Sequence, residues 1–346
     1  MTWIVALVLG LAWHPPVGAQ SPPAASNWYI QTLDSYADGE YERFDRELRA
    51  NAAGPPSRLA FLAQGLEKAA PKWIAGAPPD ARDRRRLVVA AVSVELANQA
   101  GLDDWPQARA LIEWACALVR KNARPLPAER TWHRAAVAVF EGAADAAVLQ
   151  THVAHGLKRF PDDHRLVLAR AMAAELRTWP DPRDSRTPRE HNATSVGLAV
   201  TRFNEARRFD EVRAEAAVHL GFMALRNGDA GEALPYFREA AAASPDPFVL
   251  HLLHLFRGRA LERLDRHDEA IDDYRAAVAA EGGQTARLAL ASALARGGRP
   301  EDGIRLAAEA VNGTANRADP WIAYGRGDAR MWPEILQRLR RELAVP

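Results

Sequence analysis

The sequence contains a single cysteine, Cys116, among 346 residues. No disulfide can therefore form within the chain, and a zinc site built on several thiolates is excluded. Because no cysteine directly follows the N-terminal apolar segment, we do not expect a lipid-anchored lipoprotein. Cys116 lies in the apolar stretch 111–119, so we expect it to pack as a small apolar side chain.

Net charge is also almost absent. The 45 Lys and Arg residues nearly balance the 44 Asp and Glu residues, and the two signs are interspersed along the chain. A nucleic-acid-binding surface usually shows a basic stripe, and a membrane-binding segment shows a polybasic cluster. The sequence therefore predicts no nucleic-acid partner and no polybasic membrane contact.

Signatures of catalysis are missing too. The chain has no Gly-rich phosphate loop, no His-Glu-x-x-His, no Gly-x-Ser-x-Gly and no cysteine close to a histidine in sequence. Two histidine pairs, His152 with His155 and His251 with His254, could each share a helix face, but no third ligand lies at a suitable spacing. We expect packed or exposed histidines, no catalytic residue, no metal and no cofactor.

The first 19 residues predict a secretory signal peptide. The apolar core from Trp3 to Trp13 is too short to span a bilayer, and the small residues Val17-Gly-Ala19 precede Gln20 as signal peptidase requires. The segment departs from the usual pattern because no Lys or Arg precedes its apolar core. We expect an exported protein, periplasmic or secreted, without an integral membrane span after cleavage.

Helical periodicity runs through the remaining chain, and no segment alternates with period two for long enough to predict a strand. Residues 20–178 predict an irregular helical region, whose helices end at Pro or Gly. Residues 179–195 are rich in Pro, Arg and Asp and predict a non-helical linker or flap loop. The helices predicted before that loop span 28–38, 41–53, 58–70, 84–100, 105–121, 128–140, 146–160 and 164–178.

One spacing pattern recurs in residues 196–313. Each copy starts with a small residue, followed by a second one twelve residues later, an aromatic or Ala four residues on and an Ala three residues further. Small residues at these intervals allow two antiparallel helices to approach closely. The three copies are Gly221, Ala233, Phe237 and Ala240; Gly258, Ala270, Tyr274 and Ala277; and Ala291, Gly303, Ala307 and Ala310.

This pattern resembles the tetratricopeptide repeat (TPR), whose period is about 34 residues. The resemblance is good over residues 214–282 and partial to 313. It departs from the family in lacking the usual tryptophan of the first helix and in placing Arg257 where a leucine precedes the glycine. The resemblance implies an all-α fold of helical hairpins stacked into a right-handed superhelix, with 20–178 as degenerate TPR-like repeats. A generic Ala-rich helical bundle is the alternative.

The C-terminal residues 314–346 predict a cap over the last repeat. Trp321, Tyr324 and Trp332 would cover its apolar face, and Arg338, Arg340, Arg341 and Glu342 would form the outer side. The segment from Trp321 to Leu343 also resembles the end of uncharacterised exported TPR proteins of acidobacteria and related phyla. That resemblance implies no known activity.

The TPR resemblance also implies a binding surface, because the first helix of each hairpin lines the concave face. Arg226, Arg263 and Arg296 occupy equivalent places and would form a ladder suited to carboxylates. The alternative is that they only complement helix dipoles. The residues expected on the concave face are Phe222, Leu225, Arg226, Arg259, Glu262, Arg263, Ser292 and Arg296.

We therefore expect a non-enzymatic scaffold that binds a protein or peptide partner, preferably acidic, in the cell envelope. Two other classes stay open. An all-α enzyme, such as a lyase or hydrolase acting on an envelope polymer, could assemble its acid and base from distant helices. A structural subunit of an envelope assembly would bind no free peptide. The sequence makes no prediction of oligomeric state.

Overall fold

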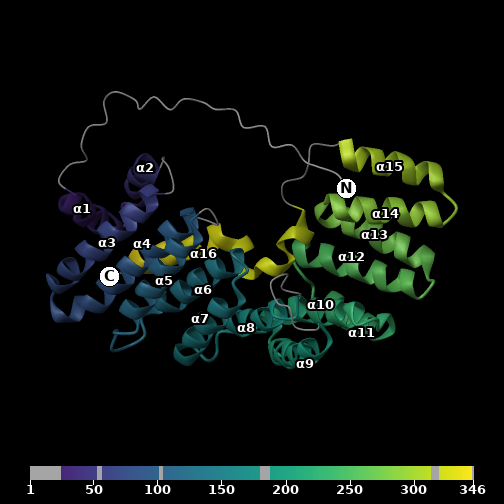
Figure 1. Cartoon of the computed structure of the whole chain (residues 1–346), viewed down its shortest axis with the longest axis horizontal. Coiled ribbons are helices and arrows are strands. Elements are labelled where there is room, and N and C mark those ends of the chain that lie inside the picture. Colours follow the sequence, from purple (N-terminus) through teal and green to yellow (C-terminus); the bar gives the residue numbers. More distant parts are fainter. Residues whose placement is uncertain (1–24, 53–56, 101–103, 180–187, 313–318, 345–346) are drawn as a thin grey trace.

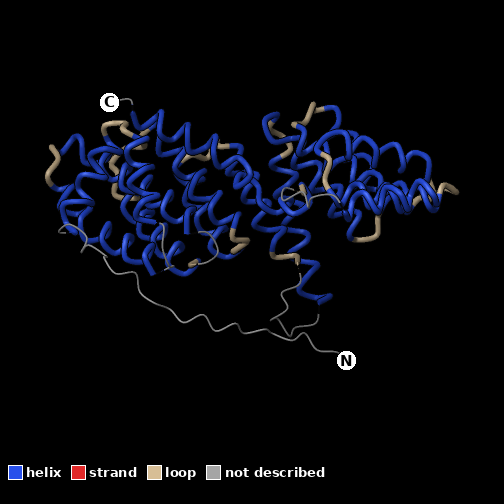
Figure 2. The backbone as a smooth tube through the Cα atoms, turned by 90° about the horizontal axis from the view of Figure 1, so that it is seen from above, coloured by secondary structure: helices blue, strands red, loops and turns tan. Residues whose placement is uncertain are grey.

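The computed structural model describes residues 25–52, 57–100, 104–179, 188–312 and 319–344. Over these ranges all regular secondary structure is helical, and the helices stack side by side along one long axis (Figures 1 and 2). The predicted all-α fold of stacked TPR-like hairpins is confirmed. None of the described helices is both long and apolar enough to cross a membrane. The predicted signal peptide lies outside the described residues.

The N-terminal half consists of successive helices of 12 to 19 residues. Asp145 and Asp163 each begin a helix, since their side chains accept hydrogen bonds from the backbone N–H groups of Val148 and Leu166. The helices are α1 (Ala25–Ala37), α2 (Tyr41–Ala52), α3 (Ser57–Ala75), α4 (Arg82–Ala100), α5 (Trp105–Val119), α6 (Pro127–Gly142), α7 (Ala146–Arg159), α8 (His164–Leu176) and α9 (Pro188–Ala206), with a 3₁₀ turn, η1 (Pro79–Ala81), before α4.

Three antiparallel hairpins follow, at the spacing that the sequence pattern predicted. A Cβ atom on Gly221 would lie 2.5 Å from the Phe237 ring, and one on Gly258 would lie 2.7 Å from the Tyr274 ring. Each aromatic ring therefore packs directly on the glycine of its own hairpin. The helices are α10 (Asp210–Arg226), α11 (Ala230–Ala242), α12 (Pro247–Arg263), α13 (His267–Glu281), α14 (Gln284–Arg296) and α15 (Pro300–Asn312).

The loop predicted over 179–195 is wrong for residues 188–195, which form the first turns of α9. Pro188 begins this helix, a position where its fixed φ angle suits the helix and its missing N–H is not needed. Helix α9 pairs with α8 as the second helix of a hairpin. Residues 180–187, which lie outside the described residues, thus connect two helices of one hairpin rather than two halves of the protein.

The predicted cap is also wrong. The segment η2 (Pro320–Met331) and helix α16 (Trp332–Ala344) turn away from α15 and run back along the inner face of the stack to the N-terminal half (Figure 1, yellow). Helix α16 packs against α6 and α4, while η2 contacts α6, α8 and α12. On α15, the apolar side chains of Ile304 and Val311 are 70% and 63% exposed. The last hairpin is therefore left uncovered by this segment.

Buried polar contacts explain why the C-terminal segment lies on the inner face. Arg165 of α8 donates one hydrogen bond of 2.7 Å to Asp328 and another of 2.8 Å to Glu215 of α10. The chain turns at Gly327, whose φ of 44° favours glycine, so that the Asp328 N–H donates to Glu141 of α6 at 2.6 Å. These contacts join three separate helices to η2.

A second contact fixes α16. Arg340 pairs with Asp45 of α2 at 2.6 Å and with Glu95 of α4 at 2.5 Å, and its side chain is only 14% exposed. The prediction that Arg340 belongs to the outer side of a cap is therefore wrong. This arginine points inward because two carboxylates of the N-terminal half lie there.

Candidate functional site

Two adjoining hollows lie where the C-terminal ends of α10, α12 and α14 meet the start of η2. They have volumes of about 230 Å³ and 430 Å³ and share Arg259 and Arg263 in their walls. We call the combined surface the arginine groove. It is lined by Trp179, Phe222, Leu225, Arg226, Arg259, Glu262, Arg263, His267, Arg296 and Trp321.

The structure brings seven of the eight residues expected on the concave face into this groove, and leaves out Ser292, which is exposed elsewhere on α14. Phe222 and Leu225 differ from expectation because they are buried, with exposed fractions of 6% and 3%. Sequence reasoning missed Trp179, His267 and the groove-forming role of Trp321. Nothing in the repeat spacing links Trp321 to α10, which is why the sequence places it in a cap.

The aromatic wall of the groove comes from both the repeats and the C-terminal segment. The Phe222 ring stacks on Phe256 with 4.3 Å between centroids, and meets Trp321 edge-on at 5.5 Å. Trp321 is held there by Asp319, which accepts hydrogen bonds from the Trp321 N–H at 3.0 Å and from the Thr285 N–H of α14 at 2.7 Å. The protein's own tail thus builds one side of the groove.

The three ladder arginines each reach back to the end of the preceding inner helix. Arg226 donates to the Thr178 hydroxyl after α8 at 3.3 Å, and Arg263 donates to the carbonyl of Leu225 at the end of α10. Arg296 pairs with Glu262 near the end of α12. Arg226 and Arg263 thus reach carbonyls at the ends of neighbouring helices, whereas Arg296 pairs with a carboxylate side chain.

Arg259 differs from the ladder arginines. It lines both hollows, and it has no ion-pair partner among the described residues; its guanidinium carbon lies 5.9 Å from the Trp321 ring centroid. Among the described residues that line the groove, one carboxylate is present, Glu262, and it already accepts a hydrogen bond of 2.8 Å from the Tyr274 hydroxyl. Burial, together with Glu262, raises the pKa of Tyr274, which stays a neutral donor. Four arginines against one carboxylate make the groove electropositive.

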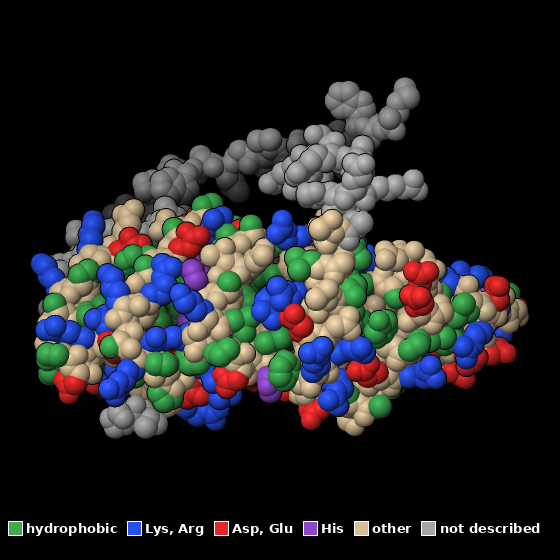
Figure 3. All heavy atoms as spheres, turned by 90° about the horizontal axis from the view of Figure 1, so that it is seen from below, with side chains coloured by type: hydrophobic (Ala, Val, Ile, Leu, Met, Phe, Trp, Pro, Cys, Tyr) green, Lys and Arg blue, Asp and Glu red, His purple; other side chains and the backbone are tan. Residues whose placement is uncertain are grey.

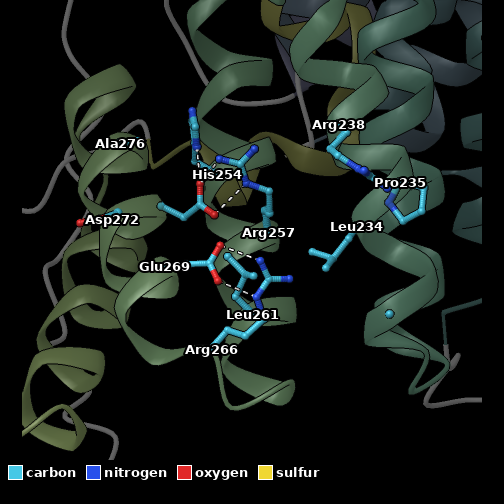
Figure 4. A pocket seen from close by; sticks show the side chains of 12 residues that line it. Leu234, Pro235, Arg238, His254, Arg257, Leu261, Arg266, Glu269, Asp272 and Ala276 are labelled. Atoms are coloured by element: carbon cyan, nitrogen blue, oxygen red, sulfur yellow. Dashed lines mark hydrogen bonds and ion pairs between the residues drawn. The ribbon is translucent and has the colours of Figure 1, made fainter.

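A larger hollow of about 650 Å³ lies between α11 and α13, over α12 (Figure 4). Most of its charges are paired, and the close-up view shows two of these clusters, whereas Arg238 has no ion-pair partner among the described residues. Asp273 accepts hydrogen bonds of 2.7 Å from both His254 and Arg257, and Arg266 pairs with Glu269 at 2.6 Å. Because little unpaired charge faces this hollow, its greater size does not make it the better candidate site.

No protein-family model matches the chain, and no curated protein matches it. Among solved structures, the chain is similar to a human IFIT1 dimer with m7Gppp-AAAA. The sequence identity is 16%, the match covers 93% of this chain and 72% of that chain, and the TM-score is 0.49. It is also similar to MamA MSR-1, with 16% identity over 53% of this chain and 94% of that chain, and a TM-score of 0.36. At these values the likeness concerns the helical arrangement and extends to no site residue.

Proposed function

We propose that the arginine groove binds an acidic peptide segment of a partner protein and that the protein is a non-enzymatic scaffold. The observation that carries this proposal is the convergence of four arginines, Arg226, Arg259, Arg263 and Arg296, around hollows whose described lining contains a single, already paired carboxylate. A guanidinium group binds a carboxylate through two parallel hydrogen bonds, so such a groove fits acidic side chains or a peptide C-terminus.

The flanking tryptophans add an apolar component to recognition. The Arg226 guanidinium lies 4.4 Å from the Trp179 ring centroid, which leaves the aromatic surface next to a charged group. Trp179 is 38% exposed, so an incoming side chain can pack against it. A peptide that carries an aromatic or aliphatic residue beside its carboxylates should therefore bind better than a purely acidic one.

Single-stranded nucleic acid is the other ligand that combines negative charge with flat rings. Affinity for it comes from several phosphate contacts spread along the strand. The formal net charge of the chain is only +1, and both signs of charge are distributed along the face that Figure 3 shows. These features favour a short acidic peptide that engages the groove alone.

The chemistry of the groove favours binding over catalysis. In the part of the lining that the structure describes, the one carboxylate, Glu262, is held by Arg296 and by the Tyr274 hydroxyl, and the one imidazole is that of His267. A general acid–base pair needs two groups that can both reach the same substrate atom. A carboxylate held by two partners is poorly placed for that role.

A peptide-display screen tests the proposal. The purified full chain should select peptides rich in Asp and Glu, and the variant Arg226→Ala/Arg259→Ala/Arg263→Ala should retain few of them. The matched control, Arg238→Ala/Arg266→Ala, removes arginines from the hollow of Figure 4 and should retain them all. Equal selection by the wild type and the triple variant would contradict the proposal. Competition by a single-stranded oligonucleotide at low concentration would point to nucleic acid instead.

We also propose that the protein is exported, so that its partner lies in the cell envelope. The small residues Val17-Gly-Ala19 before Gln20 support this. N-terminal sequencing of the protein from its native host should begin at or near Gln20. An intact Met1 in the soluble cytoplasmic fraction would contradict export and leave the groove proposal unaffected.

A further inference from the structure

A cluster of metal-binding side chains lies in the N-terminal half, away from the arginine groove. Cys116 comes from α5, and His152 and His155 come from α7; one ligand atom of each lies within 4.8 Å of the others. The Cys116 sulfur is 3.1 Å from His152 Nδ1. The sequence did not reveal this group, because the cysteine is 36 residues from the first histidine and belongs to another helix.

The fold holds the ligands in place. His152 and His155 are three residues apart, so they project from the same face of α7. The Phe140 ring of α6 stacks on His152 with 4.3 Å between centroids and limits its rotation. Cys116 and His152 are 3% and 4% exposed, whereas His155 is partly exposed and leaves a path from solvent.

One ring nitrogen in this cluster lacks a partner. Nδ1 of His155 is buried and makes no hydrogen bond. Its Nε2 has one long contact, 3.4 Å from Arg120, whose side chain lies on the surface and can move away. A buried polar atom without a partner costs free energy, and a bound ion next to this ring would offset that cost.

We propose that Cys116, His152 and His155 bind a single zinc ion. A thiolate and two imidazoles are preferred zinc ligands, and three protein ligands leave a fourth position for water. With Zn–S near 2.3 Å and Zn–N near 2.0–2.1 Å, a tetrahedral site needs a sulfur-to-nitrogen separation of about 3.5 Å. The observed 3.1 Å requires a movement of only a few tenths of an ångström.

A catalytic role for Cys116 fits less well. A thiol beside an imidazole could form a nucleophile and base, but the 3% exposed fraction of Cys116 denies a substrate access to the sulfur. In the other histidine pair, His251 Nε2 is also buried without a partner, but His251 Nδ1 donates to the Ala277 carbonyl at 2.9 Å and His254 contacts Asp273 at 2.7 Å. Among the described residues no third ligand joins that pair.

Cobalt titration of the full chain, first treated with a chelator, tests the site. Co²⁺ reports both tetrahedral geometry, through its visible absorption, and thiolate ligation, through a near-ultraviolet charge-transfer band. The wild type should bind one equivalent with both signals, and added Zn²⁺ should displace it. Cys116→Ala should lose the charge-transfer band, and His155→Ala should weaken binding at least about tenfold. The matched control is His254→Ala in the other histidine pair, which should bind Co²⁺ as the wild type does.

A thermal measurement keeps the test decisive if Cys116→Ala folds poorly. Zn²⁺ should raise the melting temperature of the wild type and of His254→Ala, because an ion that binds only the folded state stabilises it. The rise should be much smaller for His155→Ala, a substitution of a partly exposed residue. The proposal is overturned if the wild type binds no stoichiometric metal, or if His155→Ala binds Co²⁺ as tightly as the wild type.

Discussion

Removal of Arg165 should release the C-terminal segment from the inner face of the stack. Arg165 is 9% exposed and is the cation shared by Glu215 and Asp328, next to Glu141. In Arg165→Met these carboxylates stay buried, and the remaining cation is Arg330, 3.3 Å from Glu215. Removing one partner of a buried ion pair typically costs about 3–5 kcal/mol, so we expect a loss of that size in the free energy of unfolding.

The assay combines urea unfolding with hydrogen exchange. Exchange should accelerate at the amides of η2 and much less in α14, because the variant loosens the segment and not the repeats. Replacing Arg165, Glu215 and Asp328 together by Met, Gln and Asn should recover most of the loss, since no unpaired charge then remains at these positions.

An exposed ion pair provides the control. Arg275 pairs with Asp272 three residues earlier, and both side chains lie largely in solvent. Arg275→Met should cost less than about 1 kcal/mol. If Arg165→Met also costs less than about 1 kcal/mol, or if exchange in η2 does not change, the buried network does not hold the C-terminal segment.

Two further predictions concern packing and pH. Gly258→Ala should lower the melting temperature, because its Cβ would lie 2.7 Å from the Tyr274 ring and overpacking costs about 1–3 kcal/mol, which the helix preference of Ala offsets only in part. In the control Gly231→Ala the new Cβ meets nothing within 4 Å, so the melting temperature should not fall. Equal effects of the two substitutions would refute the packing role of Gly258. Burial and the Asp328 charge raise the pKa of Glu141 well above its usual range. The stability that Glu141 contributes is therefore present below its unfolded-state pKa and is lost as pH rises through its folded-state pKa. Glu141→Gln should be at least as stable as the wild type near pH 7, and denaturant titrations should show the wild type gaining relative to it as pH falls toward about 5. A loss of more than about 1 kcal/mol in the variant near pH 7 would contradict this.

Local features of the chain were predictable because they depend on residues close in sequence. The twelve-residue interval between Gly221 and Ala233 reflects one helical hairpin, and the structure shows the Phe237 ring on that glycine. Helix starts at Asp145 and Asp163 follow from side chains that each accept a hydrogen bond from the backbone N–H three residues later. The loop prediction failed at Pro188 because proline occurs after the end of a helix as well as in its first turn, and here it begins α9.

Long-range features were not predictable by the same reasoning. Trp321 contacts Phe222 across about a hundred residues, and an aromatic tail suits a cap as well as a segment along the inner face. The inward position of Arg340 depends on Asp45 and Glu95, which lie 295 and 245 residues away in sequence. The positions of the groove arginines could be read from the repeat, but their partners could not, because those partners belong to neighbouring repeats.

Calorimetry with an acidic peptide selected by the full chain tests peptide binding by the arginine groove most directly. Arg259 and Arg238 form a matched pair, because neither has an ion-pair partner among the described residues and only Arg259 lines the groove. Arg259→Ala should weaken binding by about 1.5–3 kcal/mol, the range for hydrogen bonds to charged groups, and by less at high salt. Arg238→Ala should bind as the wild type does. Equal affinities for the wild type, Arg259→Ala and Arg238→Ala would contradict the assignment of the groove as the binding site.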